Sequence, residues 1–316
     1  MKAVFLDYAT MGPDLDLKPL RDLFDDLATY DETSNEQMVE RVRNIEFAFT
    51  NKIRFTEELL REATKLRYIG LTATGTDNID LVTAEKNGIA VANIRAYCTQ
   101  SVVEHVFGTL LMLTHSLDRY NESVRAGEWQ ASQDFCILSH PVRELSAMTM
   151  GIIGFGELGQ GVARIARAFG MDVLVSARPG TKPIDDRVAL DELLARSDVI
   201  TLHCPLNADT QNLFDTTTFA RMKPGSILIN TARGGLVNSA ALVAALQSGH
   251  LSGAAIDVLA KEPPSDGDPV LDYTGPNLIV TPHIAWATNE ARQNAIDELA
   301  ANAAAFMAGE QRNRVV

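Results

Sequence analysis

The chain has 316 residues, which suggests two domains at the usual size of about 100 to 200 residues each. Acidic residues outnumber basic ones by 41 to 28, so the net charge is −13. A surface for nucleic acid or an anionic membrane is therefore not expected, because both need positive charge. With only 3 Cys no disulfide framework is expected, which favours a reducing compartment, the cytoplasm. No signal peptide is expected, because the first ten residues hold an Asp and no long apolar run.

Short apolar runs alternate with helical patterns almost throughout the chain, which is typical of α/β folds with parallel sheets. In the first third we expect strands at residues 2–6, 47–50, 68–71 and 89–92. The helices expected between these strands are residues 15–28, 56–64 and 80–87.

A long apolar helix is expected next. Ser101 and Glu104 form the S-x-x-E pattern of a capping box, which predicts a helix from Ser101 to about Tyr120. This helix is too short and too interrupted by polar residues to span a bilayer. Its two histidines, His105 and His115, are interpreted as structural. The helix and the arm around residues 129–145 are expected to form the two-fold interface of a homodimer.

A second α/β series follows, with six expected strands, the number found in a dinucleotide-binding sheet. These strands are residues 149–153, 172–176, 199–203, 226–231, 254–258 and 278–281. We expect the final helix, about residues 288–307, to return to the first domain and make it discontinuous. The expected domains are a substrate-binding domain of residues 1–100 and 285–316 and a dinucleotide-binding domain of residues 101–284.

A glycine-rich loop connects the first strand of the second series to its helix. It carries G-x-G-x-x-G at Gly154, Gly156 and Gly159. In this pattern the first glycine allows the tight turn, the second lets the backbone approach a pyrophosphate, and the third lets the helix pack on the strand. The loop residues Phe155, Glu157 and Leu158 are included in the predicted cofactor site.

The end of the next strand bears on the choice of cofactor. NAD sites usually place an acidic residue there for the ribose hydroxyl, but this strand ends Val175-Ser176-Ala177-Arg178, and Asp172 is at the wrong end. Arg178 can instead bind a 2′-phosphate, with Ser176 and Thr181 donating nearby. We therefore favour NADP(H) over NAD(H). The alternative is that Arg178 is a solvated surface residue and that the enzyme uses both cofactors.

Three successive loops at the carboxyl edge of this sheet carry candidate catalytic residues, namely Arg233, Glu262 and His283. Ligands bind at this edge in open α/β sheets. A cation, a carboxylate and an imidazole are the set needed to bind a 2-oxo acid and protonate its carbonyl. Taken singly, Arg233 and Glu262 are also explained by a solvated ion pair.

Several motifs in order along the chain carry a family resemblance. They are N-I-R-A-Y-C-T-Q-S-V-V-E-H, G-I-I-G-F-G-E-L-G, N-T-A-R-G-G-L-V-N, D-V-L-A-K-E-P-P and T-P-H-I-A-W. Together they resemble the D-isomer-specific 2-hydroxyacid dehydrogenase family over essentially the whole chain. The Trp after the His motif and the R-E-L segment at residues 143–145 are most similar to its hydroxypyruvate/glyoxylate reductases, also called glycerate dehydrogenases.

The resemblance implies a fold of two Rossmann-like domains, the substrate domain being flavodoxin-like. It also implies roles for individual residues. Arg233 binds the substrate carboxylate and keto oxygen, His283 is the acid/base, and Glu262 pairs with His283. The N–H groups of Thr74 and Gly75 hold the carboxylate. Further residues implied are Trp286 in the substrate pocket and, around the cofactor, His283, Thr99, Cys204, Pro205, Thr231, Ala232 and Asp257.

The resemblance thus implies an oxidoreductase that transfers hydride between NAD(P)H and a small 2-oxo acid. Alternatives are a lactate-type or phenylpyruvate-type dehydrogenase, or a dinucleotide-sensing binding protein of the same fold. A chain ending soon after the final helix is not expected to carry the regulatory extension of many phosphoglycerate dehydrogenases. The sequence has no G-x-S-x-G, P-loop or H-E-x-x-H motif, so no serine hydrolase, NTPase or metal site is expected.

Overall fold

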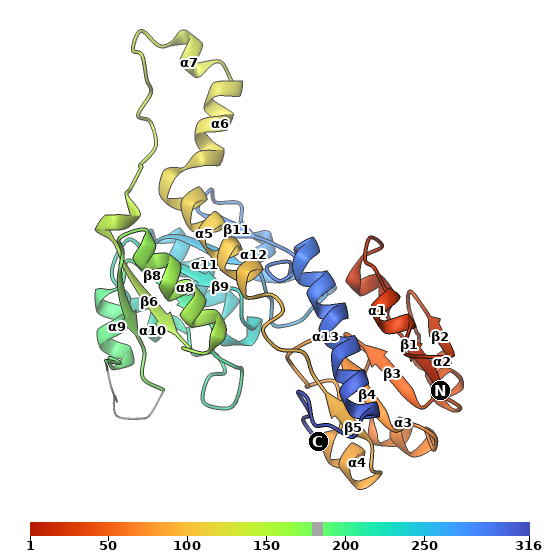
Figure 1. Ribbon diagram of the computed structural model, residues 1–316. Helices are drawn as coiled ribbons and strands as arrows, with labels where there is room; N and C mark the ends of the chain where they lie inside the picture. Colours follow the sequence, from red (N-terminus) through yellow and green to blue (C-terminus); the bar gives the residue numbers. More distant parts are fainter. Residues whose placement is uncertain (179–185) are drawn as a thin grey trace. The chain divides into compact units, whose positions relative to one another are not determined.

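The computed structural model describes residues 1–178 and 186–316. The chain divides into two compact units: unit 1 is Met1–Cys98 with Ala287–Val316, and unit 2 is Thr99–Trp286. Each unit is built on one parallel sheet (Figure 1). Among the described residues, none of the helices combines the length and the apolar character needed to cross a membrane.

The sheet of unit 1 has the strand order β2-β1-β3-β4-β5, and every pairing is parallel. This is the flavodoxin-like order, so the predicted fold class of this unit is confirmed. Its strands are β1 (Lys2–Phe5), β2 (Asp26–Thr29), β3 (Phe47–Thr50), β4 (Tyr68–Leu71) and β5 (Ala90–Ala92). Nearly all residues of the central strands are buried, as expected for a sheet covered on both faces.

The helices of unit 1 are mostly short. They are η1 (Tyr8–Met11), α1 (Lys18–Arg21), α2 (Asn35–Val42), α3 (Glu57–Glu62), α4 (Leu81–Lys86) and α13 (Asn289–Met307). The Ala-rich α13 packs closely on β4: a Cβ on Gly70 would lie 2.9 Å from Leu299 Cδ1. The ring of Phe306 lies 5.0 Å from Tyr68 and 5.7 Å from Phe47, centroid to centroid. The C-terminal helix is therefore part of the core of unit 1.

One expectation for unit 1 was wrong, and one helix was not expected. The predicted helix at residues 15–28 is a four-residue helix, α1, followed by the edge strand β2. Strand β2 forms because it pairs with β1 along its whole length, and the preceding Phe24 packs on Phe47, so tertiary contacts override local helix propensity. The helix α2 was not predicted, although Ser34 and Gln37 form a capping box at its start.

The sheet of unit 2 has the order β11-β10-β9-β8-β6-β7, again all parallel, as predicted for a six-stranded dinucleotide-binding sheet. Its strands are β6 (Thr149–Ile153), β7 (Asp172–Val175), β8 (Val199–Leu202), β9 (Ser226–Asn230), β10 (Leu251–Ile256) and β11 (Leu278–Val280). Strand β10 ends one residue before Asp257, so this carboxylate belongs to the loop at the sheet edge and not to the strand.

The remaining elements of unit 2 cover this sheet or project from it. They are α5 (Thr99–His115), α6 (Leu117–Arg125), α7 (Glu128–Ala131), η2 (Leu145–Ala147), α8 (Glu157–Ala168), α9 (Leu190–Arg196), α10 (Thr216–Arg221), η3 (Gly234–Leu236), α11 (Ser239–Gln247) and α12 (Pro269–Asp272). Within this unit, α6, α7 and the loop after them extend away from the sheet (Figure 1).

The capping box predicted at Ser101 was wrong. Helix α5 begins two residues earlier, at Thr99, so Ser101 lies inside the helix and its hydroxyl donates to the carbonyl of Ala285 at 2.7 Å. The helix also ends at His115 and not near Tyr120, because Ser116 adopts a left-handed φ of +49° that separates α5 from α6.

Candidate active site

The three glycines of the loop between β6 and α8 meet different surroundings. Gly154 has φ +95°, and a Cβ there would overlap the backbone of His203 and Cys204. A Cβ on Gly159 would overlap the carbonyl oxygen of Gly154, whereas a Cβ on Gly156 would meet nothing within 4 Å. Gly154 and Gly159 are thus required by the protein's own packing. Gly156 leaves open space at the N-terminus of α8, where a phosphate is favoured.

Two buried polar atoms that follow β9 and β8 lack a partner among the described residues, Oγ1 of Thr231 and Nδ1 of His203. Burial lowers the pKa of His203 to about 4, and its Nε2 lies 2.9 Å from Thr201 Oγ1. The thiol of the half-buried Cys204 has its pKa raised by burial. Unsatisfied buried polar groups are rare in folded proteins. Together with the open space at Gly156, they fit a bound dinucleotide.

Three other residues predicted to bind the cofactor are Thr99, Ser176 and Arg178. The hydroxyl of Thr99 donates to the carboxylate of Glu157, so these two side chains face each other. The hydroxyl of Ser176 is buried and donates to the carbonyl of Ala177 at 2.7 Å. Arg178 is exposed at the end of the same segment. Thr181, the remaining predicted phosphate ligand, lies outside the described residues.

Arg233 lies on the loop that follows β9, and the side chain of Asn230 hydrogen-bonds to the backbone of this loop. The buried Asn230 side chain accepts from the N–H of Ala232 and donates to the carbonyl of Arg233, each at 3.0 Å. A Cβ on Gly234 would overlap the backbone of Leu259 and Ala260. The loop that carries Arg233 is therefore in backbone contact with the loop that leads to Glu262, as only glycine permits.

His283 and Glu262 form a pair. Nδ1 of His283 lies 2.6 Å from Oε2 of Glu262, and Oε1 of Glu262 accepts from the N–H of Leu259 at 2.8 Å. The carboxylate is thus fixed on one side and faces the imidazole on the other. Both side chains are about one-third exposed, at 31% and 34%. With Nδ1 engaged, Nε2 is the ring nitrogen available for proton transfer.

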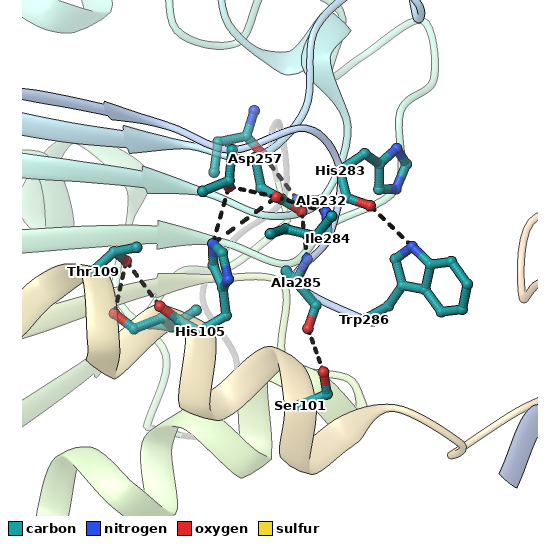
Figure 2. A network of polar contacts seen from close by, with 12 residues as sticks. Ser101, His105, Thr109, Ala232, Asp257, His283, Ile284, Ala285 and Trp286 are labelled. Carbon is teal, nitrogen blue, oxygen red and sulfur yellow. Dashed lines mark hydrogen bonds and ion pairs between the residues drawn. The ribbon is translucent and has the colours of Figure 1, made fainter. Parts of the chain in front are cut away.

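Asp257 organises the turn that carries His283 (Figure 2). Its carboxylate is 2% exposed and accepts from the N–H of Ile284 and of Ala285, each at 2.9 Å. The indole N–H of Trp286 donates to the carbonyl of His283 at 3.0 Å. The polar atoms of Asp257 and Trp286 therefore hold the turn, and their contacts with cofactor or substrate stay predictions.

Thr74 and Gly75 lie in unit 1, in the loop that follows β4. Thr74 accepts at its carbonyl from the Asn93 side chain at 2.7 Å, and its hydroxyl donates to Ile94 at 3.0 Å. Neither the N–H of Thr74 nor that of Gly75 donates to another group in the described part of the chain. The hydrogen bonds of Thr74 hold the loop in place. Its two amides are suited to bind an anionic ligand.

Comparison with known proteins decides the family. Residues 107–285 match the model of the "D-isomer specific 2-hydroxyacid dehydrogenase, NAD binding domain". The chain belongs to the D-isomer specific 2-hydroxyacid dehydrogenase family. This confirms the resemblance seen in the motifs. It also makes the chain an oxidoreductase that uses a pyridine nucleotide and acts between 2-oxo acids and D-2-hydroxy acids.

Individual relatives show which members of the family this dehydrogenase is similar to. It is 45% identical to a glycerate dehydrogenase of Methylorubrum extorquens, over 89% of this chain and 88% of the relative. It is 38% identical to a hydroxypyruvate reductase of Blautia hydrogenotrophica, over 100% of this chain and 99% of that one. Among solved structures, an acyclic imino acid reductase in complex with NADPH and D-Arg superimposes with a TM-score of 0.86 at 28% identity, with both chains covered completely.

Sequence reasoning missed the residues that hold the loops of this candidate site, chiefly Asn230, Thr281 and Ser101. One signal was available for Asn230, because it is a polar residue that follows three apolar residues in a buried strand. No comparable signal marks Thr281 or Ser101, whose partners lie far along the chain.

Proposed function

We propose that this dehydrogenase reduces a small 2-oxo acid, hydroxypyruvate or glyoxylate, to the 2-hydroxy acid. The observation that carries the proposal is the His283–Glu262 pair at the sheet edge, with the Arg233 loop in contact with the Glu262 loop. The names of the two relatives above, a glycerate dehydrogenase and a hydroxypyruvate reductase, support these substrates over larger 2-oxo acids.

In this mechanism the bound nicotinamide supplies the hydride that reaches C2 of the substrate. Arg233 binds the substrate carboxylate and keto oxygen. His283 gives the proton on Nε2 to that oxygen, and Glu262 stabilises the protonated imidazole through Nδ1. The amides of Thr74 and Gly75 are assigned to the carboxylate as well. Unit 1 (with Thr74 and Gly75) thereby has the substrate-binding role and unit 2 the dinucleotide-binding role.

NADPH is the proposed cofactor. Residues 176–178, which follow β7 directly, include the exposed cation Arg178 and no acidic residue for a ribose 2′-hydroxyl. A guanidinium matches the geometry of a phosphate and holds it by two hydrogen bonds. Because the hydroxyl of Ser176 donates to the carbonyl of Ala177, Arg178 is the side chain on which this preference depends.

The test is oxidation of NADPH and NADH, side by side, with hydroxypyruvate, glyoxylate, pyruvate and phenylpyruvate. Fast NADPH turnover with the first two supports the whole proposal, and Arg178→Ala then raises the KM for NADPH but not for NADH. Arg167→Ala, an exposed arginine at the opposite end of α8 from the glycine loop, is the matched control. Equal turnover of NADH discards the role of Arg178. A preference for phenylpyruvate changes the substrate, and no turnover with tight NADPH binding favours the dinucleotide-sensing alternative.

We also propose a homodimer formed through the projecting arm of unit 2. Large apolar side chains are exposed along it: Trp129 at 50%, Phe135 at 90% and Leu138 at 83%. Such exposure is typical of a protein–protein interface. Sedimentation should give a dimer that Phe135→Ser with Leu138→Ser weakens, while Val82→Ser on unit 1 does not. The cytoplasm is the proposed location, supported by a sequence with only 3 Cys, too few for a disulfide framework.

A further inference from the structure

The backbone of His283 adopts a conformation that needs support. Its φ is +57°, in the left-handed region that non-glycine residues rarely occupy. Asp257 provides the support from the end of β10: its carbonyl accepts from the N–H of His283 at 2.8 Å, and its carboxylate accepts from the next two amides. The position of the imidazole therefore depends on how firmly the Asp257 carboxylate is itself held.

A chain of hydrogen bonds links that carboxylate to helix α5 (Figure 2). The hydroxyl of Thr281 donates to Asp257 Oδ1 at 2.5 Å, and Nε2 of His105 lies 3.2 Å from the same hydroxyl oxygen. A hydroxyl has one proton, which here goes to the carboxylate, so the Thr281 oxygen accepts from His105. This assigns the proton to Nε2 of His105. The same Nε2 lies 3.9 Å from Asp257 Oδ1.

Helix α5 holds the catalytic turn at a second point. Ser101, one helical turn before His105, donates to the carbonyl of Ala285 at 2.7 Å. Residues four apart in a helix share one face. One face of α5 therefore contacts the turn both before His283, through Thr281, and after it, through Ala285.

We propose that His105 is a positioning residue for His283, acting through Thr281 and Asp257. Its ring side chain is 16% exposed and makes no other hydrogen bond among the described residues. His105 is thus not one of the structural histidines of an apolar helix. It completes the support of the strained turn, with Ser101 as the second contact. The inference rests on the proposed function, in which His283 transfers the proton.

The test compares His105→Phe and His105→Gln with His115→Phe. The matched control is His115, because it ends the same helix and its side chain hydrogen-bonds only to the hydroxyl of Thr114 among the described residues. We expect His105→Phe to lower kcat by about 10-fold or more, because small misplacements of catalytic groups are costly. The Kd for the dinucleotide should stay within about two-fold, since the cradle at Gly154–Gly159 is unchanged. Gln, whose amide can donate to Thr281, should recover part of kcat.

A second readout does not depend on activity. Hydrogen exchange at the amides of Ile284 and Ala285 should accelerate in His105→Phe and not in His115→Phe, because these amides are bonded to Asp257. If His105→Phe does not fold, Thr281→Val removes the same link with little change of volume, and Thr281→Ser restores it. Unchanged exchange together with unchanged kcat overturns the proposal. Accelerated exchange in a protein whose wild type reduces no 2-oxo acid supports the positioning and rejects the proposed function instead.

Discussion

Oε2 of Glu262 lies 2.6 Å from Nδ1 of His283, while the other carboxylate oxygen is held by the amide of Leu259. This arrangement engages Nδ1 and leaves Nε2 as the ring nitrogen for the proposed proton transfer. An imidazole bonded through Nδ1 to a carboxylate keeps its orientation and is stabilised when it gains charge. The contact with Glu262 thus both orients the imidazole of His283 and stabilises its protonated form.

His283→Asn should lower kcat by about 10² to 10⁴, the usual contribution of a general acid–base group. Asn tolerates a positive φ better than most residues, so the turn at φ +57° keeps its backbone and the loss reports on chemistry. The measurement is steady-state reduction of hydroxypyruvate, with His250→Asn as a control on a distant loop. A variant within a few-fold of wild type would remove His283 from the proton-transfer role.

Substitutions of the glycines in the loop between β6 and α8 should show which of them serve stability and which serve dinucleotide binding. Gly154→Ala is expected to destabilise the protein, because its φ is +95° and a Cβ overlaps the backbone of His203. Gly156→Ala should leave the urea midpoint nearly unchanged, because its Cβ meets no protein atom, and should still weaken dinucleotide binding. Equal effects of both changes on stability would contradict this division.

Glu157→Gln should tighten dinucleotide binding by several-fold. Its carboxylate begins α8, at the helix end that favours the anionic pyrophosphate, and the two negative charges repel each other. The same change should cost about 0.3 to 1 kcal/mol of stability, because an acid at a helix N-terminus is favourable. Calorimetric titration at low and high salt checks the first effect. Glu122→Gln on α6 is the control, and equal tightening there would refute the local explanation.

Asn230→Ala should raise the KM for the 2-oxo acid more than it lowers kcat. The change leaves the amide of Ala232 and the carbonyl of Arg233 without their partner, so the Arg233 loop loses its support. A buried unsatisfied group also costs about 1 to 3 kcal/mol in the free energy of unfolding. Steady-state kinetics and urea unfolding measure the two effects. Lower stability with an unchanged KM would show that Asn230 supports only the fold and has no effect on substrate binding.

His203 should make the protein sensitive to acid. Burial lowers its pKa to about 4 from the ordinary histidine value of 6.5, so the unfolded chain takes up a proton at higher pH than the folded protein. The free energy of unfolding is therefore highest above about pH 6.5 and falls by up to about 3 kcal/mol as the pH drops to 4. Urea midpoints between pH 7 and 4 should fall less steeply in His203→Asn, which cannot titrate. Parallel curves would contradict the effect of burial.

The sequence patterns located the sheets well because most strands are short apolar runs that are buried on both faces, such as β3 and β4. They failed at β2, where pairing with β1 decides the structure, and at Ser101, which bonds to a residue distant in sequence. The catalytic candidates followed from one rule, that loops at the carboxyl edge of a parallel sheet meet. The supporting contacts of Asn230 and His105 could not be predicted, because they depend on which loops and helices touch.

Unit 1 is assembled from two segments that flank unit 2 in the sequence. The amide of Val91 in β5 donates to Val316 at 3.2 Å, that of Val315 donates back to Val91 at 2.7 Å, and Phe306 covers Tyr68. During synthesis on the ribosome, residues 99–286 emerge from the exit tunnel before these partners do. Unit 2 can therefore fold first, although unit 1 begins earlier. The nascent sheet of unit 1 keeps the face of β4 exposed until α13 is made, so the N-terminal part of the chain matures last.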